Sequence, residues 1–197
     1  MDVDEKAYRA GYLSARLYGY MLSPYEPLLL QGNKIASPIT ENELRNQAAI
    51  SISIIERMDP NVIYIVGPGT TTRTITDLLD EEKTLLGVDL LLNKKVIAKD
   101  VTEKEIIKKI EGKNSKIIVT PIGGQGFIFG RGNQQISSRV IKIVGLNNII
   151  VLSTKSKLSD LKQLRIDTGD KELDDLFREH KLKEIVDYGV ELLVKVE

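Results

Sequence analysis

Two glycine-rich stretches contain the residues of this chain that could do chemistry. The first reads Gly67-Pro68-Gly69-Thr70-Thr71-Thr72-Arg73 and lies between an apolar run and a helical pattern. Glycine lets an anion come close to the backbone, and the start of a helix presents unpaired N–H groups with partial positive charge. The threonine hydroxyls and the Arg73 guanidinium add further hydrogen-bond donors. The stretch therefore predicts a cradle for a phosphate or carboxylate group, and its structural alternative is a plain glycine turn with a threonine cap.

The second stretch runs from Lys116 to Ser138 and has glycine at positions 123, 124, 126, 130 and 132. It is too long and too polar for a plain connector, since most connectors have about 4–6 residues. We interpret it as a binding loop that Phe127, Ile128 and Phe129 anchor by packing. The residues expected to contact a polar ligand are Gly123, Gly124, Gln125, Gly126, Arg131, Asn133 and Gln134. Neither stretch has the spacing of a Walker A loop or of a dinucleotide-binding loop.

Carboxylates near predicted strands and turns are the remaining candidates. Asp89 follows an apolar run, and further aspartates stand at positions 100, 167 and 170. Such a carboxylate can bind a ribose hydroxyl, hold Mg²⁺ or act as a base, and each is equally open to a role as a helix cap or turn residue. We count Asp89 among the cofactor-binding candidates. The sequence alone identifies no catalytic residue and no metal ligand.

The elements that must position these residues alternate between strand and helix. Nearly continuous apolar runs at 62–66, 117–120 and 148–153 predict strands covered on both faces. Thr40 with Glu43, and Thr102 with Glu105, have the spacing of capping boxes that open helices. A helix is also expected at 70–79, with Ile75, Leu78 and Leu79 facing inward. Further strands are expected at 84–89, 164–167 and 190–196, a hairpin at 90–98, and further helices from 137 to 145, near 158–161 and around 173–177.

This alternation predicts an α/β fold of three layers, in which a mostly parallel sheet carries helices on both faces. Ligands in such sheets bind at the carboxyl ends of the strands, where both glycine-rich stretches fall. Residues 1–40 form an irregular N-terminal arm, because Pro24-Tyr25-Glu26-Pro27 breaks any helix there, and residues 41–197 form the α/β domain. The tyrosine-rich arm favours a buried interface, so we expect a homo-oligomer.

Composition excludes several classes of function. Lys+Arg and Asp+Glu balance at 28 each, so no net field draws the chain to nucleic acid or to a membrane surface. The lack of cysteine excludes thiolate metal sites and cysteine nucleophiles, and a single histidine, His180, excludes multi-histidine sites. The acidic start lacks the apolar core of a signal peptide, and no stretch reaches the ~18 apolar residues of a membrane span. We expect a cytoplasmic protein that binds a nucleotide or another phosphorylated small molecule.

At these stretches the chain resembles the carboxyl-terminal half of the ATP-NAD kinase-like proteins. The resemblance spans essentially the whole chain, and the start of the arm resembles the segment that joins the two halves of that family. The residues that carry it are Tyr64-Ile65-Val66-Gly67-Pro68-Gly69-Thr70-Thr71-Thr72-Arg73, Lys83-Thr84-Leu85-Leu86-Gly87-Val88-Asp89, Val119-Thr120-Pro121-Ile122-Gly123-Gly124-Gln125-Gly126-Phe127, Gly130-Arg131-Gly132-Asn133-Gln134-Gln135 and Asp167-Thr168-Gly169-Asp170.

The resemblance implies phosphoryl transfer from ATP to NAD, with ATP, NAD and Mg²⁺ as cofactors. The amino-terminal half of the family carries a Gly-Gly-Asp-Gly-Thr motif whose aspartate is regarded as central to catalysis, and this sequence contains no such motif. We therefore expect an incomplete catalyst that binds nucleotide and works with a separate amino-terminal kinase half.

Two other readings stay open. The pattern of strand, glycine/threonine loop and helix also occurs in sugar-phosphate isomerases and deaminases, where Asp89 would be a candidate base. A non-catalytic domain that senses nucleotide is the third possibility.

Overall fold

The computed structural model describes residues 2–3, 15–16, 40–122, 125–161 and 163–197. Its centre is a seven-stranded sheet in the order β11-β10-β8-β6-β3-β4-β5. Four neighbouring strands are parallel: β3 (Ile63–Val66), β6 (Ser115–Val119), β8 (Ile149–Leu152) and β10 (Lys181–Asp187). Antiparallel strands complete the sheet, with β11 (Val190–Lys195) at one edge and the hairpin of β4 (Asp89–Leu92) and β5 (Lys95–Ala98) at the other.

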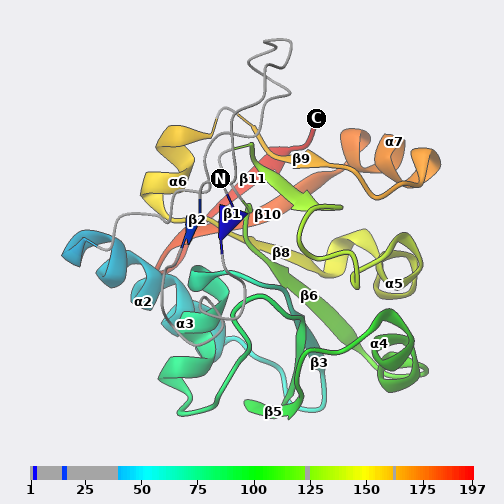
Figure 1. The fold of residues 1–197 in the computed structure, drawn as a ribbon, viewed down its shortest axis with the longest axis horizontal. Helices are drawn as coiled ribbons and strands as arrows, with labels where there is room; N and C mark the ends of the chain where they lie inside the picture. Colours follow the sequence, from blue (N-terminus) through cyan, green and yellow to red (C-terminus); the bar gives the residue numbers. More distant parts are fainter. Residues whose placement is uncertain (1, 4–14, 17–39, 123–124, 162) are drawn as a thin grey trace.

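Helices cover both faces of this sheet (Figure 1). One face carries α2 (Glu41–Glu56), α3 (Thr70–Leu78) and α6 (Lys155–Asp160). The other face carries α4 (Glu103–Ile110), α5 (Ser138–Val144) and α7 (Lys171–Glu179), and the 3-10 turn η1 (Leu146–Asn148) follows α5. The predicted three-layer α/β fold with a mostly parallel sheet is confirmed. None of the helices in the described part of the chain is long and apolar enough to cross a membrane.

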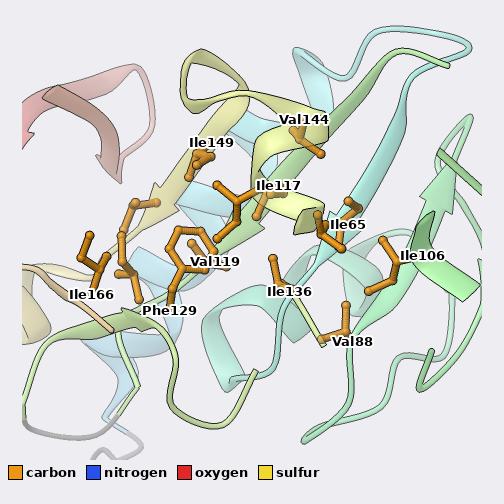
Figure 2. Close-up of a cluster of buried hydrophobic side chains, with 14 of the residues drawn as sticks. Ile65, Val88, Ile106, Ile117, Val119, Phe129, Ile136, Val144, Ile149 and Ile166 are labelled. Carbon is orange, nitrogen blue, oxygen red and sulfur yellow. The ribbon is translucent and has the colours of Figure 1, made fainter. Parts of the chain in front are cut away.

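The core has two halves because successive side chains of a strand point to opposite faces. Ile65, Ile117 and Val119 face α4 and α5, where they join the cluster shown in Figure 2. Tyr64 and Ile118, one position along in each strand, pack against α2 and α3 instead. Burial on both faces explains why these strands are almost uniformly apolar in sequence.

A small parallel ribbon holds the second glycine-rich stretch against the domain. It consists of β7 (Phe127–Phe129) and β9 (Arg165–Ile166). Phe129 is fully buried, and its ring lies 5.7 Å from the Phe177 ring of α7. The expectation that aromatic residues anchor this loop by packing agrees with these contacts. A second short pair, β1 (Asp2–Val3) with β2 (Ala15–Arg16), is antiparallel.

Helix starts follow the sequence closely. Thr102 and Glu105 form the full predicted capping box at α4. At α2 the Thr40 hydroxyl accepts from the Glu43 amide, but the Glu43 carboxylate accepts from Gln47 rather than completing the box. The tight hairpin turn falls at Asn93-Lys94, where both residues have positive φ.

Two expectations are wrong, and one strand was not expected. Residues 84–88 form a loop rather than a strand, because the Thr84 amide and hydroxyl both bond to the Asp89 carboxylate instead of a neighbouring strand. Leu78 is 48% exposed, because α3 turns the stripe of Thr71, Thr72, Ile75 and Thr76 to the sheet. Strand β10 was not expected, because lysines alternate with its buried residues at its start. Most of the predicted arm of residues 1–40 lies outside the described residues.

Candidate functional site

The carboxyl ends of β3 and β6 lie side by side at one edge of the sheet. The Gly67 amide, just past β3, donates to the Ile118 carbonyl of β6 at 2.9 Å. Gly69 has φ +127°, and a Cβ there would lie 2.6 Å from Thr120 Cγ2. A side chain at position 69 is therefore excluded both by backbone strain and by space. The sequence predicted a tight glycine turn here, but not its contact with Thr120.

Helix α3 begins directly at this point. Gly69 is its N-cap, and within the part of the chain that the structure describes no side chain caps the helix. The first intrahelical bond runs from the Arg73 amide to the Gly69 carbonyl at 3.1 Å, so the amides of Thr70, Thr71 and Thr72 precede the helical ladder. An uncapped first turn carries partial positive charge and unpaired donors, which suit an anion.

The three threonines have different roles. Thr70 is exposed, whereas Thr71 and Thr72 are fully buried. The Thr72 hydroxyl donates to the carbonyls of Gly67 and Gly69 at 2.8 and 3.0 Å, so it stabilises the turn. Arg73 is exposed, and its guanidinium pairs with Asp77 one turn along the helix at 3.5 Å. Of the polar side chains predicted in this stretch, Thr71 is the one that turns toward a partly buried cation.

That cation is Lys157 of helix α6, which the sequence analysis did not single out. Its Nζ donates to Thr71 Oγ1 at 3.1 Å and to Thr120 Oγ1 at 2.8 Å. Burial lowers the pKa of the Lys157 ammonium to about 8, and the Glu43 carboxylate opposes that shift. The available signal was its position: Ser153-Thr154-Lys155-Ser156-Lys157 follows the apolar strand β8, and so reaches the same sheet edge as the other two loops.

Helix α2 contributes a polar face to the same region. Glu43 and Gln47 are both buried, and Gln47 Nε2 donates to Glu43 Oε1 at 3.2 Å. Thr74 of α3 in turn donates to Gln47 Oε1 at 3.3 Å. Glu43 was expected only as part of a helix cap, but the helix turns it inward toward α6.

Asp89 lies at the same edge but is engaged inside the protein. Its carboxylate accepts from the Thr84 amide at 2.6 Å, the Thr84 hydroxyl at 2.7 Å and the Asp100 amide at 2.7 Å. Lys83 Nζ lies 3.9 Å away, and both side chains are fully buried. Burial lowers the pKa of Lys83 to about 8, with Asp89 opposing the shift. In this arrangement Asp89 organises the loop at 83–89 and presents no free oxygen to a ligand.

This loop also supports the start of α3. The Leu85 carbonyl accepts from the Gly69 amide at 3.1 Å, so the loop fixes the residue that caps the helix. A Cβ at Gly87 would lie 2.4 Å from Asp100 Oδ1 and 2.5 Å from Thr84 Oγ1, which shows how closely the loop is packed.

Some candidate residues of the second stretch hold the loop together, and others are exposed to solvent. Arg131 donates to Gln125 Oε1 at 2.7 Å and stacks 4.1 Å over the Phe127 ring. Asn133 is fully buried and donates to the Ile128 carbonyl at 2.8 Å, while its Oδ1 has no hydrogen-bond partner among the described residues. Gly126 approaches Gln163, and Gln134 is exposed. Gly123 and Gly124 lie outside the described residues. Among the candidate side chains of this stretch that the structure describes, none contacts Lys157; that contact comes from Thr120, at the end of β6.

Asp170 and a shallow surface hollow both lie away from the start of α3. Asp170 is the N-cap of α7, and its hydrogen bond with Lys142 lowers the pKa of its carboxyl. The described residues contain no group of three metal-ligating side chains. A shallow hollow over α5, lined by Ser138, Arg139, Lys142 and Ile143, includes none of the predicted site residues.

A family model described as the ATP-NAD kinase C-terminal domain matches residues 60–182, well over half of the chain. The chain belongs to this ATP-NAD kinase C-terminal domain family. No curated protein and no solved structure matches the sequence.

The matched range includes most of the candidate site residues. It begins at Pro60, just ahead of β3, and includes Gly67 to Arg73, the second glycine-rich stretch and Lys157. Helix α2 with Glu43 precedes it. The family is thus established over residues 60–182, while the resemblance of residues 1–59 and 183–197 stays a prediction.

Proposed function

We propose that this chain is the nucleotide-binding, carboxyl-terminal portion of an ATP-NAD kinase-like phosphotransferase, which transfers a phosphoryl group from ATP to NAD. Two findings support this proposal. The family match is to the corresponding domain of ATP-NAD kinases. The observation that carries it is the uncapped start of α3, which faces the Lys157 ammonium at the carboxyl edge of the sheet.

The chemistry of this edge suits phosphate. The amides at the start of α3 would donate to phosphate oxygens, and Gly69 would leave room for them. Lys157 would neutralise charge, and the exposed Arg73 would reach a more distant phosphate with its forked donors. Exposed Thr70 adds one hydroxyl at the entrance.

Mg²⁺ is the cofactor that the described residues fit least well. Asp89 already accepts three hydrogen bonds, and the described residues gather no three acidic or imidazole ligands. We assign no Mg²⁺ ligand to them.

The transfer step itself would need a residue from elsewhere. The sequence has no Gly-Gly-Asp-Gly-Thr motif, whose aspartate the resemblance makes central to catalysis. We propose that this chain binds nucleotide, and that phosphoryl transfer requires an amino-terminal kinase half that carries the motif.

The test is a thermal-shift panel on the purified chain. It would contain ATP, NAD, NADP, inorganic polyphosphate and several sugar phosphates, each with and without Mg²⁺. A ligand at 100 times its Kd adds about 2.7 kcal/mol of stability, which raises the unfolding temperature measurably. We expect ATP or NAD to raise it. If sugar phosphates alone do so, the kinase-like proposal fails and an isomerase-like enzyme takes its place.

Gly69→Ala tests whether the ligand binds at the start of α3. Its Cβ would collide with Thr120 and distort the start of α3, so we expect the ligand-induced shift to disappear. Gly112→Ala is the control, because Gly112 also has positive φ, at +68°, but a Cβ there meets nothing within 4 Å. It should lower stability by about 1 kcal/mol and keep the full ligand-induced shift.

A further inference from the structure

Lys157 is held in place by two neutral groups. The hydroxyls of Thr71 and Thr120 are almost wholly excluded from solvent, and each accepts one hydrogen bond from its ammonium. Thr71 belongs to the first turn of α3 and Thr120 follows β6, so the lysine from α6 reaches across three adjacent loops. An ammonium has three donors, and these two bonds leave one of them for a ligand.

No direct ion pair with a described residue balances the charge of Lys157. Glu43, the carboxylate that acts on its ammonium, is hydrogen-bonded to Gln47. The ammonium also lies beside the start of α3, where the helix dipole is positive. Cations are stabilised at the other end of a helix, and anions at this one. The surroundings of Lys157 therefore favour an additional anion.

The size of the charge indicates which anion. The ammonium contributes one positive charge, and a helix start contributes roughly half a charge. A phosphomonoester carries about 1.5 to 2 negative charges at neutral pH and has three free oxygens. A phosphodiester or a carboxylate has one charge and two free oxygens. The amides of Thr70 and Thr71 and the third N–H of Lys157 together supply three donors. They match the three free oxygens of a phosphomonoester.

We propose that Lys157 and the first turn of α3 form a site for a terminal phosphoryl group, and that Lys157 selects this group over bridging phosphates and carboxylates. The proposal deepens the proposed function and rests on it for the nucleotide. Within that function, the site takes the terminal phosphate of ATP or the 2′-phosphate of NADP, and not the pyrophosphate bridge of NAD. Thr71 and Thr120 are positioning residues, since they hold the ammonium.

The test is calorimetric titration of the full chain with AMP, ATP, inorganic phosphate, glucose 6-phosphate and NAD. Lys157→Met should weaken binding of the terminal phosphates of AMP and ATP at least tenfold, and binding of NAD less than threefold. Lys155→Met is the matched control, because Lys155 is two residues away on α6, is mostly exposed and pairs with Asp187. It should leave every affinity unchanged within twofold. The unfolding temperature of Lys157→Met should equal or exceed that of the wild type, which shows that the fold is kept.

A pH series separates binding from a purely structural role. The ammonium must be charged to hold phosphate, so the wild-type affinity for AMP should fall above pH 8, by up to tenfold per pH unit. The Lys157→Met affinity should lack this fall. Lys83, whose pKa is also about 8, is present in both proteins and affects both pH profiles alike. Glu43 acts on the Lys157 ammonium, which only the wild type contains. The difference between the two affinity profiles therefore reports the ionisation of Lys157.

The outcomes separate this inference from the proposed function. If AMP and ATP bind equally well to Lys157→Met, the inference is overturned and the kinase-like function stands. If glucose 6-phosphate and inorganic phosphate bind through Lys157 while ATP and NAD do not, the inference holds and the kinase-like function fails. If no phosphate binds the wild type, both fall.

Discussion

Asp89 and Lys83 form a buried ion pair beneath the candidate site. Both side chains are fully excluded from solvent, and the carboxylate is satisfied by three further donors. Removing one partner of such a pair leaves an uncompensated buried charge. The loop that this pair organises supplies the Leu85 carbonyl to Gly69, so the pair also affects the start of α3.

Asp89→Asn should therefore lower the free energy of unfolding by about 3 kcal/mol, because an amide cannot balance Lys83 and presents one oxygen where the carboxylate presents two. Urea denaturation measures this loss. Asp77→Asn is the control, since Asp77 forms an exposed pair with Arg73 and should cost less than about 1 kcal/mol. Equal losses in the two variants would show that Asp89 is not held as described.

At the scale of elements, the ribbon of β7 and β9 depends on one glycine. Gly130 follows β7 with φ +86°, and a Cβ there would lie 1.7 Å from the Asp167 carbonyl oxygen. No rotamer change can relieve a collision with backbone, so β7 and β9 would have to separate. Phe129, which precedes Gly130, would lose its place against Phe177 in α7.

Gly130→Ala should cost about 3 kcal/mol of unfolding free energy, from left-handed backbone strain together with the collision. Gly132→Ala is its matched control, since Gly132 has φ +75° but its Cβ would only touch Ile122 at 3.4 Å. That variant should cost about 1 kcal/mol. Hydrogen exchange of the Arg165 amide, which donates to Gly126, would show whether the ribbon has opened in Gly130→Ala alone.

For the whole molecule, the buried Lys83 and the partly buried Lys157 make stability depend on alkaline pH. The pKa values of Lys83 and Lys157 fall from 10.5 to about 8, and desolvation is the main cause in both. The unfolded chain binds these protons more tightly than the folded chain. Folding is penalised below pH 8, and the penalty disappears as the pH rises from about 8 toward 10.5.

The free energy of unfolding should thus increase between pH 8 and 10, by up to about 3 kcal/mol for Lys83 and less for the partly exposed Lys157. Denaturant titrations across this range measure the slope. Lys157→Met should remove its own share of the slope, and Lys155→Met should remove none. A wild-type stability that falls steadily over the same range would contradict the burial of both ammonium groups.

The sequence by itself determined the local structure of this protein. Strand runs such as Ile117 to Thr120, the caps at Thr40 and Thr102, and the hairpin at Asn93-Lys94 are set by side-chain periodicity and turn chemistry, which act between near neighbours. The glycine turn before the helix at Thr70 could be recognised for the same reason. These signals were enough to predict the α/β class and that both glycine-rich stretches follow strands of the sheet.

Only the tertiary structure decided which side chains meet at that edge. Lys157 contacts Thr120 and Thr71, which are 37 and 86 residues away in sequence, because β3, β6 and β8 are neighbours in the sheet. The inward turn of Glu43 and the internal role of Asp89 depend on the same packing. Sequence spacing cannot supply such contacts, because strand order and helix rotation are fixed by the burial of the whole core rather than by any one segment.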